Sequence, residues 1–282
     1  MTQRAIHSYT WIPRWSTEGG KLAAERAAAH EYDLLAIPLR DHEVIEPEAI
    51  AALCRANGIK PVTTSPLQAG NDISSTDPDI RKRGVERHIA ALSLARDMGA
   101  TRMGGILYSA FGKASRAATE ENVMAAAEGL HQVAEAAREK GITLTLEVVN
   151  RYESNLINTA ADAVRLIGLI GADNVKVHLD TFHMNIEEDS LLGALETALP
   201  HLAYFELDQN HRGRLGQGSI DFAPLLQRLK AVGYEGVVGV EAFSSTVSHP
   251  DIAAGVGAWR PLFAHGDEVA EDGRRLLVAN GF

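Results

Sequence analysis

The chain has 282 residues, of which 45% are hydrophobic, and this length and composition suit one barrel of alternating strands and helices. Its formal net charge of −10 argues against a nucleic-acid partner, because binding nucleic acid needs a basic surface that displaces counterions. The single cysteine, Cys54, excludes an internal disulfide. The lack of both a signal-peptide pattern and an apolar run of roughly 20 residues predicts a soluble, cytoplasmic protein with no membrane partner.

Eight strand-like segments alternate with segments of helical periodicity along the chain. The strands are predicted at residues 4–9, 33–39, 60–64, 101–107, 142–148, 175–180, 202–207 and 236–241. The helices are predicted at residues 17–30, 46–57, 77–98, 118–140, 158–171, 189–199, 221–232 and 266–280. Gly141, Gly171 and Gly233 follow three of these helices, as expected of a residue that tolerates left-handed backbone geometry.

Strict alternation of strand and helix predicts a parallel sheet, and eight such units predict a single (β/α)8 TIM barrel domain over residues 1–282. An open, doubly wound sheet is the alternative. It usually carries a glycine-rich turn after its first strand, but residues 9–15 read Tyr-Thr-Trp-Ile-Pro-Arg-Trp. The barrel is therefore favoured, and its active site should lie in the loops that follow the strands.

Four apolar runs in the second half of the chain, each within a predicted strand, end on a carboxylate, namely Glu147, Asp180, Glu206 and Glu241. In a barrel these side chains would share one mouth, and several carboxylates cannot all ionise in a small space without a cation. A single acid in such a position is more often a helix cap, but four in successive units predict a divalent metal site. His183 follows Asp180 closely and adds an imidazole where a substrate would lie.

Three segments around these acids carry a resemblance to a known family. Residues 146–152 read Leu-Glu-Val-Val-Asn-Arg-Tyr, residues 177–188 read Val-His-Leu-Asp-Thr-Phe-His-Met-Asn-Ile-Glu-Glu, and the third segment runs from Gly233 through Glu241 to Phe243. With these segments the chain resembles the D-tagatose/D-psicose (ketose) 3-epimerases, which belong to the xylose-isomerase-like TIM barrels. The resemblance covers most of the chain and is loosest over the early strands.

The resemblance implies a divalent metal ion, with Mn²⁺ first and Mg²⁺ or Co²⁺ as alternatives. Its ligands fall on Glu147, Asp180, Glu206 and Glu241. Glu206 stands where the family has a histidine; a carboxylate can still bind such ions, and its added negative charge should hold the cation more tightly while weakening its Lewis acidity. His211, five positions later in the loop, is a possible substitute ligand, although its surroundings suggest a substrate loop.

The resemblance also implies substrate-binding roles for Glu153, His183 and Arg212, and a catalytic role for the pair Glu147 and Glu241. The reaction would invert the C3 configuration of a ketose by removing a proton to give an enediolate and returning one from the other face. The metal would stabilise the negative charge of that intermediate. The expected partner is a small sugar, and the expected assembly is a homodimer or homotetramer.

Several alternatives stay open. The same barrel could isomerise an aldose to a ketose, dehydrate a keto-polyol, or bind a sugar without reaction; a nucleic-acid repair enzyme is disfavoured by the acidic charge. The substrate could also be a sugar phosphate, with Gly216-Gln-Gly218-Ser219 as the phosphate cradle, although a tight turn is the favoured interpretation. Smaller expectations are apolar site walls at Phe111, Phe243 and Trp15, barrel-lining positions for His7 and His178, and a helix start at Glu187-Glu188.

Overall fold

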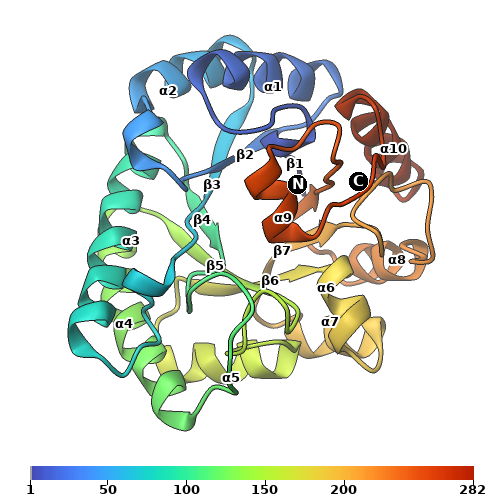
Figure 1. Cartoon of the computed structure of the whole chain (residues 1–282). Helices are drawn as coiled ribbons and strands as arrows, with labels where there is room; N and C mark the ends of the chain where they lie inside the picture. The colour runs from blue at the N-terminus through green and yellow to red at the C-terminus, as the bar shows by residue number, and fades with distance from the viewer. Residues whose placement is uncertain (1) are drawn as a thin grey trace.

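The computed structural model describes residues 2–282 and shows eight parallel strands closed into one barrel (Figure 1). Neighbouring strands pair in chain order, and the first pairs with the last, with Ile6 opposite Val240. The strands are β1 (Gln3–His7), β2 (Leu34–Pro38), β3 (Lys60–Thr64), β4 (Arg102–Gly105), β5 (Thr143–Val148), β6 (Val175–Asp180), β7 (Leu202–Leu207) and β8 (Val237–Val240). The predicted TIM barrel is confirmed, and the open sheet is excluded.

All eight predicted helices are present around the outside of the barrel, and their ends lie within about two residues of the predicted ones (Figure 1). They are α1 (Thr17–Ala29), α2 (Pro47–Ala56), α3 (Pro78–Met98), α4 (Glu120–Glu139), α5 (Ala160–Ile170), α7 (Leu191–Ala198), α8 (Ala223–Ala231) and α10 (Gly266–Ala279). None of the helices formed by residues 2–282 is long and apolar enough to cross a membrane.

Two short α-helices were not predicted, α6 (Thr181–Glu187) and α9 (Pro250–Val256), and both lie in segments that follow a strand. The expected helix start at Glu187-Glu188 is wrong, because α6 begins directly after β6 and ends at these two acids. The Glu187 carboxylate instead accepts hydrogen bonds from Arg151, and Glu188 accepts one from the backbone N–H of Ala160 at 2.6 Å. Both acids therefore tie α6 to the segment after β5.

The barrel interior changes from apolar to polar along the strands. Every second residue of a strand faces inward, so that each strand contributes a short series of interior side chains. The apolar interior cluster consists of Ala5, Leu34, Ala36, Val62, Tyr204 and Val237. Further along the same strands the interior positions carry titratable side chains. A larger apolar cluster packs between the strands and the helices and surrounds the barrel.

Candidate active site

The structure brings the four predicted acids together at the carboxyl ends of β5 to β8. Asp180 lies opposite Glu206 in the β6–β7 register, and Glu241 follows β8, where its backbone N–H donates to the carbonyl of Leu207. Three groups of side chains can each bring ligand atoms within 4.8 Å of one another. They are Glu147 with Asp180 and His183; Glu147 with His178 and Glu206; and Asp180 with Asp208 and Glu241.

Burial and mutual repulsion disfavour ionisation of these acids. Burial raises the pKa of Glu147 and of Glu206 well above the ordinary carboxyl range, and the charge of Glu241 raises both further. The pKa of Asp180 is raised in the same way, by burial first and by Glu206 next. A divalent cation would favour the ionised forms, because an opposite charge at close range lowers a carboxyl pKa.

The two carboxylate oxygens of Asp180 differ in their hydrogen bonding. Its Oδ1 accepts from the backbone N–H groups of Phe182 at 2.7 Å and His183 at 3.2 Å, and thereby caps α6. Its Oδ2 is buried without a hydrogen-bond partner. The same is true of His178 Nε2, His183 Nε2 and Asp208 Oδ1. Because unpaired buried polar atoms are costly, a pocket with several of them suits a cation and a polar substrate, and the oxygen-rich donor set fits Mn²⁺ or Mg²⁺.

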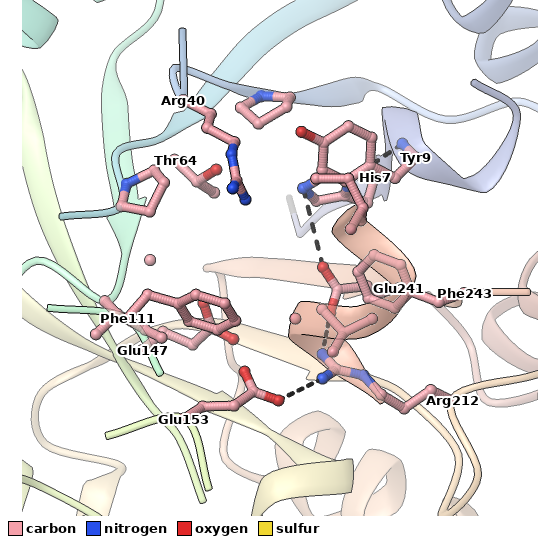
Figure 2. Close-up of a pocket in the computed structure, with 17 residues that line it drawn as sticks. His7, Tyr9, Arg40, Thr64, Phe111, Glu147, Glu153, Arg212, Glu241 and Phe243 are labelled. Atoms are coloured by element: carbon pink, nitrogen blue, oxygen red, sulfur yellow. Dashed lines mark hydrogen bonds and ion pairs between the residues drawn. The ribbon is translucent and has the colours of Figure 1, made fainter. Parts of the chain in front are cut away.

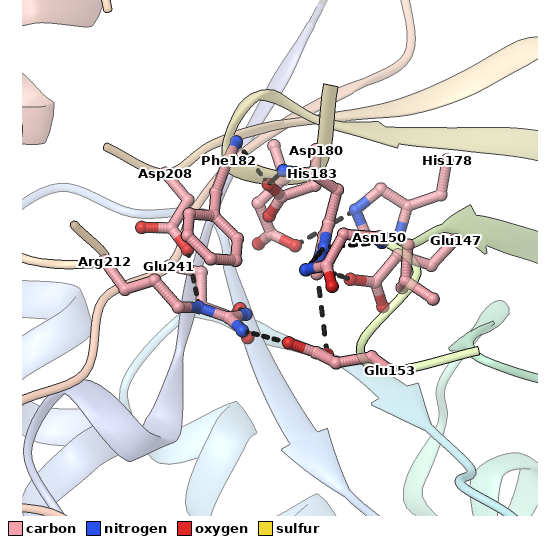
Figure 3. Close-up of polar contacts among 12 residues, drawn as sticks. Glu147, Asn150, Glu153, His178, Asp180, Phe182, His183, Asp208, Arg212 and Glu241 are labelled. Atoms are coloured by element: carbon pink, nitrogen blue, oxygen red, sulfur yellow. Dashed lines mark hydrogen bonds and ion pairs between the residues drawn. The ribbon is translucent and has the colours of Figure 1, made fainter. Parts of the chain in front are cut away.

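Arg212 joins three acids on one side of the site (Figure 3). Its guanidinium donates to Glu153 Oε1 at 2.7 Å, to Glu241 Oε2 at 2.7 Å and to Asp208 Oδ2 at 3.1 Å. Its central carbon lies 4.5 Å from the ring centre of Phe182 and 4.8 Å from that of Phe243. The residue has a φ of 60°, a backbone conformation that side-chain-bearing residues adopt rarely and mostly at functional sites.

His183 is fixed in one tautomer by the backbone. Its Nδ1 accepts from the backbone N–H of Asn150 at 3.0 Å, so that in the neutral ring the proton sits on Nε2. Burial lowers the pKa of His183 well below its ordinary value, which keeps the ring neutral. Nε2 lies 3.6 Å from Glu147 Oε1 and 4.0 Å from Glu153 Oε2. A ring nitrogen that carries a proton cannot bind a metal, so this geometry favours substrate binding by His183.

His178 lies against Glu206 inside the barrel. Its Nε2 is 3.0 Å from Glu206 Oε2, in an orientation that does not form a hydrogen bond, and its ring centre is 4.2 Å from that of Tyr204. The Tyr204 hydroxyl donates to Glu206 Oε1 at 3.4 Å. The sequence correctly placed His178 on the barrel lining but missed this contact. Its two-residue spacing from Asp180, which puts both on one face of β6, was the available signal.

A cavity opens beside these acids and is lined by residues of β1 to β5 and of the segments that follow several strands (Figure 2). Glu147, Glu153, Arg212 and Glu241 lie on its wall, with Phe111 and Phe243 as predicted apolar neighbours. Trp15 does not line this cavity; its ring instead covers Gly20 of α1, where a Cβ would lie 2.7 Å from the ring.

Two other predicted features lie outside the acid cluster. His211 turns back on its own loop, where Nδ1 accepts from the backbone N–H of Gly213 at 3.0 Å. The backbone N–H of Gly216 donates to Asp272 Oδ2 at 3.4 Å, and that of Ser219 donates to Asn210 Oδ1 at 2.9 Å. Since these amides already have partners, residues 216–219 match the favoured interpretation as a turn.

Comparisons with known proteins agree with this architecture. The family model described as "Xylose isomerase-like TIM barrel" matches residues 24–276. The chain is 33% identical to the ketose 3-epimerase of Arthrobacter globiformis, over 93% of this chain and 91% of that protein. It is 35% identical to the L-ribulose 3-epimerase of Mesorhizobium japonicum, over 98% of this chain and 93% of that one.

Among solved structures, the D-allulose 3-epimerase of Methylomonas sp. in complex with D-allulose superposes with a TM-score of 0.96. The two sequences are 32% identical, and the match covers 99% of this chain and 97% of the other. The chain therefore belongs to the xylose isomerase-like TIM barrels and, within them, to the ketose 3-epimerase family of isomerases.

Proposed function

We propose that the protein is a metal-dependent epimerase that inverts ketoses at C3. The observation that carries this proposal is the placement of Glu147 and Glu241, which reach one cavity from different sides (Figure 2). Epimerisation needs this arrangement, because a proton must leave from one face of the substrate and return to the other. The similarity to proteins named ketose, L-ribulose and D-psicose 3-epimerase supports the same reaction class.

The acid cluster fits a divalent metal ion. Glu147, Asp180, Glu206 and Glu241 would hold it, and four oxygen donors favour Mn²⁺, with Mg²⁺ or Co²⁺ as alternatives. When bound, the ion supplies positive charge that stabilises the enediolate oxygens. The unpartnered Oδ2 of Asp180 is the strongest structural support for a cation here, since the other oxygen of that carboxylate is already used by α6.

The remaining steps belong to the chain itself. Glu147 and Glu241 exchange the roles of base and acid with the direction of the reaction. Arg212 fixes the Glu241 carboxylate through the bond from its guanidinium to Oε2, and it fixes Glu153 through the bond to Oε1. His183 presents a neutral Nε2–H group between Glu147 and Glu153, where it can donate to a substrate oxygen. We therefore propose Glu153, His183 and Arg212 as substrate-binding residues.

Exchange of substrate protons with solvent tests the proposal. The metal-stripped protein is reloaded with Mn²⁺ and incubated in D₂O with a panel of ketoses and ketose phosphates, and NMR follows each carbon. We expect deuterium at C3 together with a new epimer. Glu147→Gln and Glu241→Gln should each abolish this exchange, whereas Glu135→Gln, a surface acid paired with Arg138, should not. Absence of C3 exchange throughout the panel, in protein shown to contain metal, would contradict the proposal.

The residue at position 206 leaves a second reaction as an alternative. Glu206 replaces the family's histidine, and it contacts His178 and Tyr204, so the charge of the metal site differs from the expected one. An altered site could instead take a proton from C1, which gives the C1–C2 enediolate that leads to an aldose, or it could carry the C2–C3 enediolate to a dehydrated product by loss of a hydroxide from C4. Product analysis in the same experiment separates these outcomes, because aldose formation removes a proton from C1 and returns one to C2 without exchange at C3, and a dehydratase releases water.

Self-association as a homodimer or homotetramer also remains a proposal, drawn from the family resemblance. Light scattering on the purified protein measures the mass of the assembly directly. A mass of two or four chains of 30.4 kDa would support it, and a monomer at micromolar concentration would refute it.

A further inference from the structure

The wall of the cavity away from the acid cluster carries a second set of polar side chains. Tyr9, Arg40 and Thr64 follow or end the first three strands, and all three line the cavity that also contains Glu147 and Glu241. Figure 2 shows the Arg40 guanidinium pointing into this space, on the side opposite Glu153 and Arg212, with the Tyr9 hydroxyl and the Thr64 side chain directed to the same region.

The polar ends of these three side chains have no hydrogen-bonding partner in the described part of the chain. Among residues 2–282, the Arg40 guanidinium forms no hydrogen bond or ion pair, and neither the Tyr9 hydroxyl nor the Thr64 hydroxyl donates to another group. Arg212, by contrast, uses its guanidinium on Glu153, Asp208 and Glu241. Within the described part of the cavity wall, Arg40 is thus the arginine still free to bind a ligand.

The other basic side chain on this wall, His7, lies against the acid cluster, with its Nε2 3.9 Å from Glu241 Oε1. The positive charge available to a ligand is therefore concentrated at Arg40. The acid cluster repels an anion, so an anionic group would be accommodated at the Arg40 end and excluded from the reacting end.

The backbone around Arg40 is held in place. Arg87 donates from Nη2 to the carbonyl oxygen of Arg40 at 2.5 Å, and the backbone N–H of Leu39 donates to the carbonyl of Thr64 at 2.7 Å. Pro38 and Thr64 are also direct neighbours in the β2–β3 register. These bonds fix the two chain segments that present Arg40 and Thr64, which reduces the entropic cost of binding a ligand between them.

We propose that Arg40, Tyr9 and Thr64 form a subsite for an anionic group, a phosphate or a carboxylate, at the end of the ketose that lies away from the reacting carbons. A guanidinium flanked by hydroxyl donors matches the planar, multiple acceptor geometry of these anions, whereas neutral sugar hydroxyls do not require a full positive charge. This inference rests on the proposed epimerase function for the orientation of the substrate, and it specifies the substrate as an anionic ketose.

Matched substrate pairs test the subsite. The Mn²⁺-loaded enzyme is assayed for C3 exchange with a ketose, with the same ketose phosphorylated at its terminal carbon, and with the ketose that carries a terminal carboxylate. We expect kcat/KM to be at least about 10-fold higher for one of the anionic forms, as a charge-assisted hydrogen bond implies. The preferred anion distinguishes phosphate from carboxylate. Equal or better turnover of the neutral ketose would overturn the subsite.

Substitutions of Arg40 distinguish a loss of anion binding from a general loss of activity. Arg40→Gln should raise KM for the preferred anionic ketose by about 10–100-fold and change KM for the neutral ketose by no more than about twofold. Arg40→Lys should recover part of the loss, because it restores the charge without the planar fork. Arg165→Gln, which removes a surface pair with Glu120, is the matched control and should change neither. An equal effect of Arg40→Gln on both substrates would contradict the proposal.

A binding measurement keeps this test independent of catalysis. Glycerol 3-phosphate and glycerol are titrated into the Mn²⁺-loaded protein by calorimetry, since neither contains a ketone that could react. We expect binding of glycerol 3-phosphate to the wild-type protein and its loss in Arg40→Gln, with the Arg165→Gln control unchanged. If no ketose exchanges its C3 proton but this pattern holds, the epimerase proposal fails and the anion subsite stands. If exchange occurs but glycerol 3-phosphate binds both proteins equally, or neither, the subsite fails and the epimerase stands.

Discussion

At the scale of single residues, the unusual feature of the site is the pair formed by Glu206 and His178. Both side chains are buried, and His178 Nε2 lies 3.0 Å from Glu206 Oε2. Burial lowers the pKa of His178 to about 3, so the imidazole is neutral and packs against the carboxylate without neutralising it. Residues that contact a metal ligand without binding the metal themselves typically contribute strongly to metal affinity. The family has a histidine at the position of Glu206 on β7. In this chain an imidazole lies beside that position instead, on β6, one interior position away from Asp180.

Removing this imidazole should weaken metal binding. We expect His178→Asn to lower the affinity for Mn²⁺ by about 10–100-fold, because Glu206 loses the ring that packs against it and limits its positions. Calorimetric titration of the metal-stripped protein measures the effect. His201→Asn, in the turn before β7, is the control and should bind Mn²⁺ as the wild type does. Unchanged affinity in His178→Asn would mean that Glu206 does not depend on His178.

Restoring the family's residue at Glu206 should shift the balance between binding and catalysis. Glu206→His removes one negative charge, so we expect weaker Mn²⁺ binding but faster C3 exchange once the site is saturated, since the cation keeps more of its positive charge for the substrate. Exchange rates measured over a range of Mn²⁺ concentrations separate the two effects. A variant that binds Mn²⁺ more tightly, or exchanges more slowly at saturation, contradicts this argument.

At the scale of elements, the junction between β6 and α6 combines folding and function in one side chain. Asp180 ends the strand, its Oδ1 caps the helix, and its Oδ2 stays free for a cation. The β6–β7 register also shifts beside Val177 and His178, and this irregularity places Tyr204 opposite His178. Such irregularities often re-aim side chains next to active sites. The element boundary, more than any single loop, therefore sets the geometry of the acid cluster.

Two substitutions at Asp180 should separate these roles. Asp180→Asn keeps a side-chain oxygen for the cap, so we expect the free energy of unfolding of the metal-free protein to change little while Mn²⁺ affinity falls at least about 10-fold. Asp180→Ala loses the cap as well and should cost about 1 kcal/mol of stability in addition. Chemical denaturation and metal titration of both variants measure the two quantities. Equal stability of the Asn and Ala variants would show that the cap is unimportant.

The strands and their terminal acids were predictable because a two-residue period and a single face are properties of local sequence. α6 was missed because it starts without a loop, so the pattern of β6 runs into it and its acids resemble the start of the next helix. The three hydrogen bonds of Arg212 could not be predicted from the sequence for another reason. They join loops after β5, β7 and β8, and only the closed barrel fixes the distances between such loops.

At the scale of the whole molecule, the barrel holds a cluster of acids that its own burial keeps from ionising. The pKa values of Glu147, Asp180, Glu206 and Asp208 are all raised, with burial as the largest cause in each case. A carboxyl whose pKa is higher in the folded than in the unfolded protein stabilises the fold most below its unfolded pKa, near 4, and less as pH rises. Metal binding acts in the opposite direction, because the ligands must lose their protons and the affinity therefore increases with pH.

The stabilisation of the protein by metal should therefore grow with pH. We expect the difference in Tm between Mn²⁺-loaded and EDTA-treated protein to be larger at pH 8 than at pH 5.5. A free Mn²⁺ concentration of about 100 times Kd adds about 2.7 kcal/mol, which corresponds to a difference of roughly 4–5 °C for a domain of this size. Thermal unfolding at several pH values measures it, with Glu206→Gln as the comparison, since one fewer proton must leave that site and the pH dependence should be shallower. A Tm difference that is constant or falls as pH rises would show that the buried acids do not bind the metal in their ionised form.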